Sequence, residues 1–379
     1  MKKFKDLDRD KQNAFLTVGI ICGILLTFLV ADFLQEDRLY SARERRVLAA
    51  RPEMTKETLL DGSFMEDYEA YVTDQFVSRD KWIDLKTAID LAMQKKELNG
   101  VYLCEDDYLI ERHTEADFPE EKVEEKLALL TKLVDRWDAK VMLVPTADNI
   151  MKNRLPDYAE YYDQAAFLEN VSGRIGNQNY IDVYSVLLEH RDEELYYRTD
   201  HHWNTKGAYY GYKAWVEAMD FDPINYDLNS LETVSDSFLG TLHSKVNLSM
   251  KPDIIEYFPR TERLPVRVTY DMTKASDTYY ETKYLEGNNQ YGYFLDDNHA
   301  FVEIDTWNNN GKSLFVIKDS YANCMIPLLA LHYDKVYVVD LRYMNAQLFP
   351  FMEQYETKGD MDVLVLYNCV HFLEDFKYR

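Results

Sequence analysis

The stretch Ser313-Leu314-Phe315-Val316-Ile317-Lys318-Asp319-Ser320-Tyr321-Ala322-Asn323 decides the fold of this chain. Its apolar first half predicts a buried strand over residues 313–317, and the sequence from Tyr321 to His332 predicts a helix directly after it. Ser320 is therefore expected in the turn at the carboxyl end of a strand, where α/β proteins place reactive groups. The helix N-terminus and backbone N–H groups of such a turn can stabilise an oxyanion. Alternatively, the serine is only a helix N-cap.

Apolar strands and amphipathic helices alternate on both sides of this stretch. Strands separated by helices imply a parallel sheet that helices cover on both faces. Between about residues 225 and 310 the pattern changes to short Tyr- and Thr-rich stretches, which predict a β-rich insertion, and a hairpin is expected over 100–110. The predicted fold class is therefore α/β. The expected strands are 141–144, 180–183, 335–339 and 362–366, and the expected helices are 123–137, 164–171, 205–219 and 346–355.

A second polar motif is Asp200-His201-His202-Trp203-Asn204. A carboxylate two residues before an imidazole can fix its tautomer, which leaves the other ring nitrogen to face a nucleophile from elsewhere in the fold. A serine hydroxyl needs such a base, because it is a poor nucleophile until a neighbouring group takes its proton. One alternative is a capped helix start with surface histidines. The other is a metal site, but no further Glu or His is spaced to complete one, so no metal is expected.

The N-terminal region predicts a membrane anchor. The apolar run over residues 14–34 is long enough to cross a bilayer and too long for an ordinary signal-peptide core. We expect a cytoplasmic segment over 1–13, the anchor over 14–34, a stalk and helical segment over 35–99, and a catalytic domain over 100–379. Basic residues flank the run on both sides, so charge alone does not decide the orientation. The large domain is expected outside the cell, on a single-pass cell-membrane protein.

Composition limits the partners. The net charge of −24 argues against nucleic acid. Thirty tyrosines would suit a carbohydrate groove, although tyrosine is more often a core residue that needs one polar partner. Cys22 lies in the apolar run, and Cys104, Cys324 and Cys369 show no disulfide or zinc spacing. We expect no cofactor.

These motifs resemble those of the bacterial DHHW proteins, relatives of the alginate O-acetyltransferase family with an SGNH-hydrolase-like domain. The resemblance rests on Asp200-His201-His202-Trp203-Asn204, on the run from Lys318 to Asn323 and on Asp340-Leu341-Arg342-Tyr343, with weaker echoes at residues 60–62, 74–76 and 238–242. It implies that Ser320 is the nucleophile, that His202, which directly precedes Trp203, is the general base, and that Asp200 orients it.

Two residues depart from the family pattern. A second histidine, His201, stands where alginate-type relatives have a small residue, and its role is open. Lys318 stands where a Gly-Asp-Ser motif has glycine, which puts the oxyanion geometry of the family in doubt.

Three further residues are expected to bind substrate. Arg342 follows the strand after Ser320, so it can meet Ser320 across the sheet edge, although a surface salt bridge is an equal alternative. Tyr343 and Trp203 are the other two, and Thr146 and Asn368 at strand ends are weaker candidates.

The sequence thus predicts a membrane-anchored serine acyl-transfer enzyme that acetylates a cell-surface polysaccharide through an acyl-serine intermediate. A carbohydrate esterase would use the same triad with water as acceptor. A non-catalytic surface glycan-binding protein is the alternative outside enzymes. The resemblance implies that a multispanning membrane O-acyltransferase supplies the acetyl groups.

Overall fold

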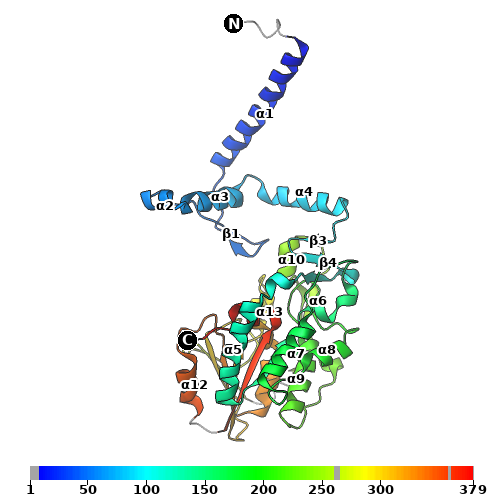
Figure 1. The fold of residues 1–379 in the computed structure, drawn as a ribbon, viewed down its shortest axis with the longest axis vertical. Coiled ribbons are helices and arrows are strands. Elements are labelled where there is room, and N and C mark those ends of the chain that lie inside the picture. The colour runs from blue at the N-terminus through cyan, green and yellow to red at the C-terminus, as the bar shows by residue number, and fades with distance from the viewer. Residues whose placement is uncertain (1–7, 260–264, 357–359, 379) are drawn as a thin grey trace. The chain divides into compact units, whose positions relative to one another are not determined.

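The computed structural model describes residues 8–259, 265–356 and 360–378. The chain divides into two compact units, Met1–Lys95 and Lys96–Arg379 (Figure 1). The finer domain boundaries expected from the sequence stay predictions.

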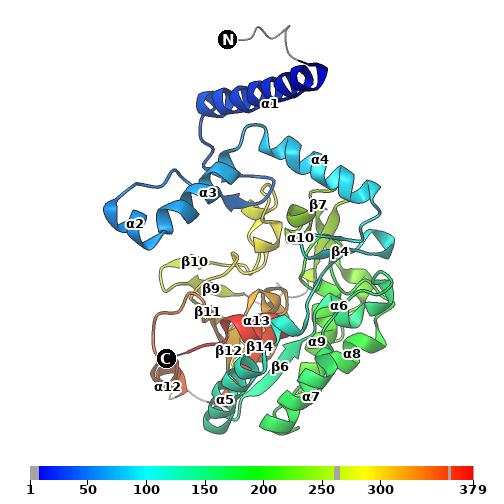
Figure 2. The same ribbon diagram turned by 45° about the horizontal axis from the view of Figure 1, so that its top comes forward.

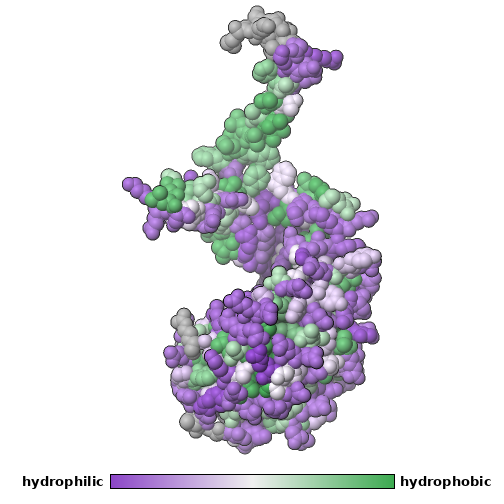
Figure 3. Space-filling model, in the orientation of Figure 1, coloured by the Kyte–Doolittle hydropathy of each residue, from purple (hydrophilic) through white to green (hydrophobic). Residues whose placement is uncertain are grey.

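The first unit begins with a long apolar helix, α1 (Arg9–Leu34), which Asp8 caps by accepting from the N–H of Lys11. It is the one helix in the described part of the chain that is long and apolar enough to cross a membrane, and a signal sequence near the N-terminus would pass the same test. Its apolar surface forms a continuous band in Figure 3. The finding is compatible with the predicted anchor.

The rest of the first unit is helical. Trp82, Leu85 and Ile89 lie on α4 (Arg79–Ala92) and are about half exposed. Trp82 packs its ring against Phe28 of α1, and Phe76 stacks on the same phenylalanine. The remaining elements are β1 (Tyr40–Ser41), β2 (Arg46–Val47), α2 (Lys56–Asp61), α3 (Ser63–Gln75) and α4 (Arg79–Ala92).

The second unit is built on a seven-stranded sheet with the strand order β10-β9-β11-β13-β12-β14-β6 (Figure 2). Four neighbouring strands are parallel, and within them Ile317 pairs with both Val339 and Val365. These strands are β13 (Lys335–Val339), β12 (Lys312–Lys318), β14 (Asp360–Asn368) and β6 (Lys140–Val144).

The β-rich insertion is present, but it changes the sheet from parallel to mixed. Its strand β11 (Phe301–Asp305) pairs antiparallel with β13, and β9 (Arg267–Tyr270) and β10 (Lys274–Ser276) extend the same sheet antiparallel. The expectation of a wholly parallel sheet is therefore wrong, because the insertion covers the free edge of β13. Two further strands, β7 (Glu232–Phe238) and β8 (Asp253–Tyr257), form a separate antiparallel ribbon.

Helices cover both faces of the sheet, as expected. Alternate residues of β12 enter different cores: Leu314 and Val316 pack into one, and Phe315 and Ile317 into the other. The first core takes in α8 (Val183–Glu189), α9 (Thr205–Ala218) and α11 (Ile326–Leu329), and the second α5 (Glu120–Trp137), α7 (Gln164–Ile175), α12 (Leu348–Glu356) and α13 (Cys369–Asp375).

Two predicted elements differ in the structure. Tyr180 makes only an isolated bridge with Val141, and Val183 begins α8, because Asp182 caps that helix instead of continuing a strand. The helix expected from Tyr321 to His332 is broken into η9 (Ser320–Cys324), α11 and η10 (Ala330–His332). Pro327 lies in the first turn of α11, where a helix tolerates a residue without a backbone N–H. The same residue would interrupt a helix that began earlier, because it cannot donate the hydrogen bond that a position inside a helix requires.

The expected hairpin at the start of the unit is part of a three-stranded sheet. Leu109 of β5 donates its N–H to the carbonyl of Arg198, which attaches this small sheet to the segment leading into Asp200. Its strands are β3 (Glu97–Leu98), β4 (Val101–Leu103) and β5 (Leu109–Glu111). The remaining short helices are η2 (Glu105–Asp107), η3 (Glu115–Asp117), α6 (Ala147–Ile150), η4 (Lys152–Arg154), η5 (Leu228–Ser230), α10 (Thr241–Val246), η7 (Thr282–Tyr284) and η8 (Gln290–Tyr293).

Candidate active site

Ser320 lies at the carboxyl end of β12, as the first residue of η9. The N-cap of η9 is Asp319, whose carboxylate accepts from the N–H of Tyr321 at 2.9 Å. The hydroxyl of Ser320 is therefore free of the capping role that was its alternative explanation. The N–H of Tyr321, one of the backbone N–H groups of this turn, is taken up by the same cap.

The Asp200 motif reaches Ser320 through the start of α9. Asn204 caps this helix by accepting from the N–H groups of Lys206 and Gly207, both at 3.0 Å. Trp203 is fully buried and donates its indole N–H to the carbonyl of Tyr321 at 2.8 Å. The helix cap and the indole together hold the motif against the turn that carries Ser320.

Asp200, His202 and Ser320 form a continuous chain of hydrogen bonds. Nδ1 of His202 lies 2.6 Å from Oδ1 of Asp200, and Nε2 of His202 lies 2.7 Å from Oγ of Ser320. All three residues are nearly buried. Burial alone would raise the pKa of Asp200, but the neighbouring imidazoles and the hydrogen bonds from His202 and Thr241 hold it well below its usual range. The arrangement allows His202 to take the proton of Ser320.

The β-rich insertion contacts Asp200, His202 and Ser320 through residues that the sequence motifs did not reveal. The ring of Tyr291 stacks on His202 with centroids 3.9 Å apart, and its hydroxyl donates to the carbonyl of Ser320 at 3.1 Å. Thr241 donates its N–H and its hydroxyl to Oδ2 of Asp200, at 2.7 and 3.0 Å. The weak family echo at 238–242 was the one signal that could have pointed to Thr241, while Tyr291 carries none.

Gly240 belongs to the same echo and lies against the triad carboxylate. A Cβ atom at this position would lie 2.2 Å from Cβ of Asp200 and 2.6 Å from its Oδ2. Because Gly240 has an ordinary backbone φ of −81°, close approach is the reason that a glycine fits here.

The expected substrate-binding residues lie elsewhere. Arg342 donates to both oxygens of Asp340, at 2.9 and 2.6 Å, and lines a different cavity together with Lys377 and Tyr378. Tyr343 is half exposed beside that guanidinium. The full burial of Trp203 leaves it no surface for a substrate. In the structure Trp203 packs in the core and Arg342 pairs with Asp340, and the substrate roles expected for Trp203, Arg342 and Tyr343 stay predictions.

Lys318, which replaces the glycine of a Gly-Asp-Ser motif, is buried without disturbing the serine. Its ammonium group donates to Oδ1 of Asn298 at 2.8 Å and lies 3.4 Å from Asp340. Burial lowers its pKa, and the charge of Asp340 opposes that shift.

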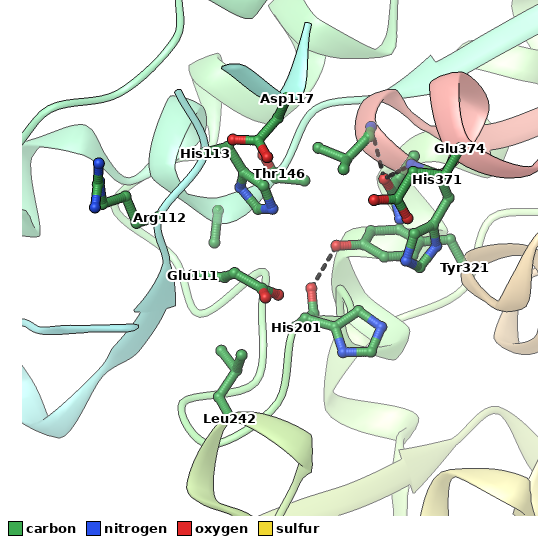
Figure 4. Close-up of a pocket in the computed structure, with 13 residues that line it drawn as sticks. Glu111, Arg112, His113, Asp117, Thr146, His201, Leu242, Tyr321, His371 and Glu374 are labelled. Atoms are coloured by element: carbon green, nitrogen blue, oxygen red, sulfur yellow. Dashed lines mark hydrogen bonds between the residues drawn. The ribbon is translucent and has the colours of Figure 1, made fainter. Parts of the chain in front are cut away.

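A cavity of about 150 Å³ lies beside the triad (Figure 4). Its wall includes His201 and Tyr321, which are next to His202 and Ser320 in the chain, and the two weaker candidates Thr146 and Asn368. Ser320 itself is not part of the wall as the structure stands.

Metal binding is a possible alternative use of the motif. Ligand atoms of Asp200, His201 and His202 lie within 4.8 Å of one another. However, both oxygens of Asp200 and both ring nitrogens of His202 already have hydrogen-bond partners, and Nδ1 of His201 lies 2.7 Å from the hydroxyl of Thr241. These contacts fit a proton-transfer site.

Comparison with known proteins agrees with the sequence resemblance. The family model described as "DHHW protein" matches residues 138–339, more than half of the chain. A search of the curated proteins finds no match.

Two solved structures with TM-scores above 0.5 share the fold at low identity, and a third match has a lower TM-score. A DHHW family protein from Eubacterium siraeum is 22% identical with a TM-score of 0.60, over 75% of this chain and 97% of that one. Bacillus cereus PatB1 with a sulfonyl adduct is 17% identical with a TM-score of 0.58, over 73% and 98%. The O-acetyltransferase domain of Pseudomonas putida AlgJ is 15% identical with a TM-score of 0.41, over 74% and 94%. On the strength of the family match, this chain belongs to the DHHW protein family.

Proposed function

We propose that this protein is a serine O-acetyltransferase with an SGNH-hydrolase-like domain, which acetylates a hydroxyl of a cell-surface polysaccharide. Ser320 is the nucleophile, His202 the general base and Asp200 its orienting carboxylate. The observation that carries the proposal is the unbroken chain of two hydrogen bonds, 2.6 and 2.7 Å long, from Asp200 through His202 to Ser320.

The reaction has two steps. In the first, Oγ of Ser320 attacks the acetyl carbonyl while its proton moves to Nε2 of His202. The leaving group then departs with that proton, and the acetyl group stays on Oγ. In the second, a sugar hydroxyl gives its proton to His202 and attacks the acetyl carbon, the bond to Oγ breaks, and Ser320 recovers a proton from His202. Asp200 stabilises the imidazolium in both steps.

Two comparisons support the chemistry. The DHHW motifs of this chain resemble those of the alginate O-acetyltransferase family. PatB1, which has a similar fold, was determined with a sulfonyl adduct.

The membrane setting is part of the proposal. We place α1 as an uncleaved single-pass anchor in the cell membrane, with the unit Lys96–Arg379 outside the cell. A membrane-bound O-acyltransferase is then the donor of acetyl groups.

The test is acetylation of the full-length protein in detergent by p-nitrophenyl acetate, followed by intact-protein and peptide mass spectrometry. We expect one acetyl group on Ser320 in the wild type and none in Ser320→Ala. In His202→Ala, acylation should fall by about 10³-fold or more, because the serine loses its base. The control Ser185→Ala removes an exposed hydroxyl and should acylate like the wild type.

Acylation that persists in Ser320→Ala would refute the proposal. If acetyl-Ser320 forms and passes to water even when polysaccharide is present in excess, the protein is an esterase with the same triad. If the folded protein is never acylated, a glycan-binding role becomes the better account.

A further inference from the structure

The second histidine of the motif has a defined tautomer. Nδ1 of His201 lies 2.7 Å from Oγ1 of Thr241, and this hydroxyl lies 3.0 Å from Oδ2 of Asp200. A carboxylate can only accept, so Thr241 gives its single hydroxyl proton to Asp200. Thr241 must therefore accept from His201, which places the proton of His201 on Nδ1 and leaves a lone pair on Nε2.

No described residue donates a hydrogen bond to that lone pair. Nε2 of His201 is buried and has no hydrogen-bond partner among the described residues. The rings of His201 and His202 lie 3.9 Å apart, and burial, followed by the neighbouring His202, lowers the pKa of His201 to about 3. His201 is thus a neutral hydrogen-bond acceptor beside the general base. A buried acceptor without a donor is unfavourable, and buried polar groups are usually paired.

His201 is one of the residues that line the cavity beside Asp200, His202 and Ser320 (Figure 4). The cavity has a volume of about 150 Å³. Thr146 lines the same cavity, and its hydroxyl is hydrogen-bonded to Asp148 and Gln164.

The charges of the wall favour an uncharged ligand. Glu111, Asp117 and Glu374 contribute carboxylates, and Arg112 is the one arginine of the lining. The two other histidines each have their own buried carboxylate, since His113 lies 3.4 Å from Asp148 and His371 lies 3.0 Å from Asp319. Lys245, outside the lining, contacts Glu111. The remaining acidic groups would repel a carboxylate on a ligand.

We propose that this cavity is the acceptor site and takes an uncharged, hydroxyl-rich sugar, whose hydroxyl donates a hydrogen bond to Nε2 of His201. The inference rests on the proposed function. Nε2 is covered in this structure and neither Ser320 nor His202 lines the cavity, so the proposal includes a turn of the His201 ring that opens Nε2 and the reacting groups to the sugar. His201 thereby holds the acceptor next to His202, the base that takes the proton of the reacting hydroxyl.

Two substitutions test the roles of the two ring nitrogens of His201 separately. Asparagine can place an amide N–H near Nδ1 and keep the bond to Thr241, but it has no atom at the place of Nε2. Glutamine can place an amide near Nε2 instead. We therefore expect acetyl transfer to fall about 10-fold in His201→Asn, by the loss of one hydrogen bond, and less in His201→Gln.

The measurement uses the full-length protein in detergent, p-nitrophenyl acetate as donor, and two acceptors of equal length, cellotetraose and tetragalacturonate. The p-nitrophenol burst reports acylation of Ser320, and mass spectrometry of the oligosaccharides reports transfer. The wild type should acetylate cellotetraose about 10-fold faster than tetragalacturonate, since like charges oppose binding of the latter. In His201→Asn the burst should fall by less than about 3-fold, well below the loss in transfer.

A further variant does not touch the triad. Glu374 is exposed at the cavity rim, and Glu374→Gln should narrow the preference for the neutral acceptor. Equal transfer to both sugars in the wild type, or an equal loss of burst and transfer in His201→Asn, would overturn the acceptor site while leaving the serine mechanism intact. Absence of any burst in the wild type would overturn both proposals.

Discussion

At the scale of single residues, the two oxygens of Asp200 are used by different partners. Oδ1 accepts from the ring and the N–H of His202, and Oδ2 accepts from the N–H and the hydroxyl of Thr241. Through Thr241, the same carboxylate also fixes the proton of His201. One buried side chain thus sets the tautomers of two adjacent imidazoles.

We expect Asp200→Asn to lower acylation by about 10³- to 10⁴-fold, because an amide N–H facing Nδ1 of His202 forces the proton onto Nε2. Nε2 then cannot accept from Ser320. The measurement is the burst rate with p-nitrophenyl acetate, with circular dichroism to check folding. Asp236→Asn, at an exposed carboxylate of β7, is the control. Wild-type acylation in Asp200→Asn would contradict the assigned role.

The pair of Asp319 and His371 predicts a pH-dependent contribution to stability. Burial lowers the pKa of His371, but the hydrogen bond and charge of Asp319 outweigh it, and the net direction is upward. A histidine whose folded pKa is raised adds stability that is complete below its unfolded pKa, near 6.5, and disappears as pH rises through the folded pKa. The Tm difference between wild type and His371→Gln should therefore be larger at about pH 6 than at about pH 8.5.

Differential scanning fluorimetry at the two pH values measures this difference. The pKa of His113 is raised as well, so the wild type alone would report both histidines. The difference between the wild type and His371→Gln isolates the contribution of His371 to stability. Asp319 stays ionised in both states over this range because its pKa is lowered from 3.8. A Tm difference that grows with pH would contradict the prediction.

Asp200, His202 and Ser320 could be predicted from the sequence because each belongs to a local pattern. Asp200 and His202 are two residues apart, and Ser320 ends an apolar strand, so local patterns were enough to single them out. Thr241 and Tyr291 reach the triad only through the folding of the insertion, and no spacing encodes that contact. The sequence also could not show that the guanidinium of Arg342 pairs with Asp340, two residues away, because spacing does not reveal which way a side chain turns.

At the scale of elements, the start of α9 sets the position of His202, the proposed general base. His202 lies two residues before the N-cap Asn204, so any loosening of the first turn is passed to the imidazole. The expected helix after Ser320 shows the limit of periodicity, since its apolar residues fit a helix while Pro327 breaks it. The pairing of β11 with β13 was equally hidden, because alternation shows which face of a strand is buried but not its neighbour.

Asn204→Ala should lower the free energy of unfolding by about 1 kcal/mol, since two N–H groups of α9 lose their acceptor. It should also slow acylation, because the His202 ring loses part of its support. Asn204→Ser keeps a capping oxygen and is the matched variant. Chemical denaturation and the burst rate test both effects, and equal values for the alanine and serine variants would contradict the role of the cap.

At the scale of the whole molecule, composition predicted the class of protein better than it predicted which residues are in the core and which line a binding groove. Many of the thirty tyrosines are core side chains, among them Tyr196, Tyr212, Tyr333 and Tyr367. Their abundance therefore reflects packing more than a carbohydrate groove. The apolar N-terminal helix and the α/β alternation were both recognisable, since each depends on long runs of residues rather than on contacts between distant ones.

We expect the native protein to remain in the membrane fraction after alkaline carbonate extraction, because a helix such as α1 buries about 20 apolar residues in lipid. Its intact mass should include residues 1–34, and protease added to whole cells should cleave the unit Lys96–Arg379. A mature protein that lacks α1 would show that the helix is a signal sequence. A protease-resistant unit that becomes cleavable only after lysis would place it inside the cell.

The close approach of Gly240 to Asp200 has a consequence for reading other chains. A methyl group at this position would occupy the space of the carboxylate, so the triad depends on a place where no side chain exists. A homologous sequence can therefore keep its aspartate, histidine and serine and still have lost the ability to react. Such a silent loss would be invisible to any inventory of reactive groups, and the residue at position 240 is where to look for it.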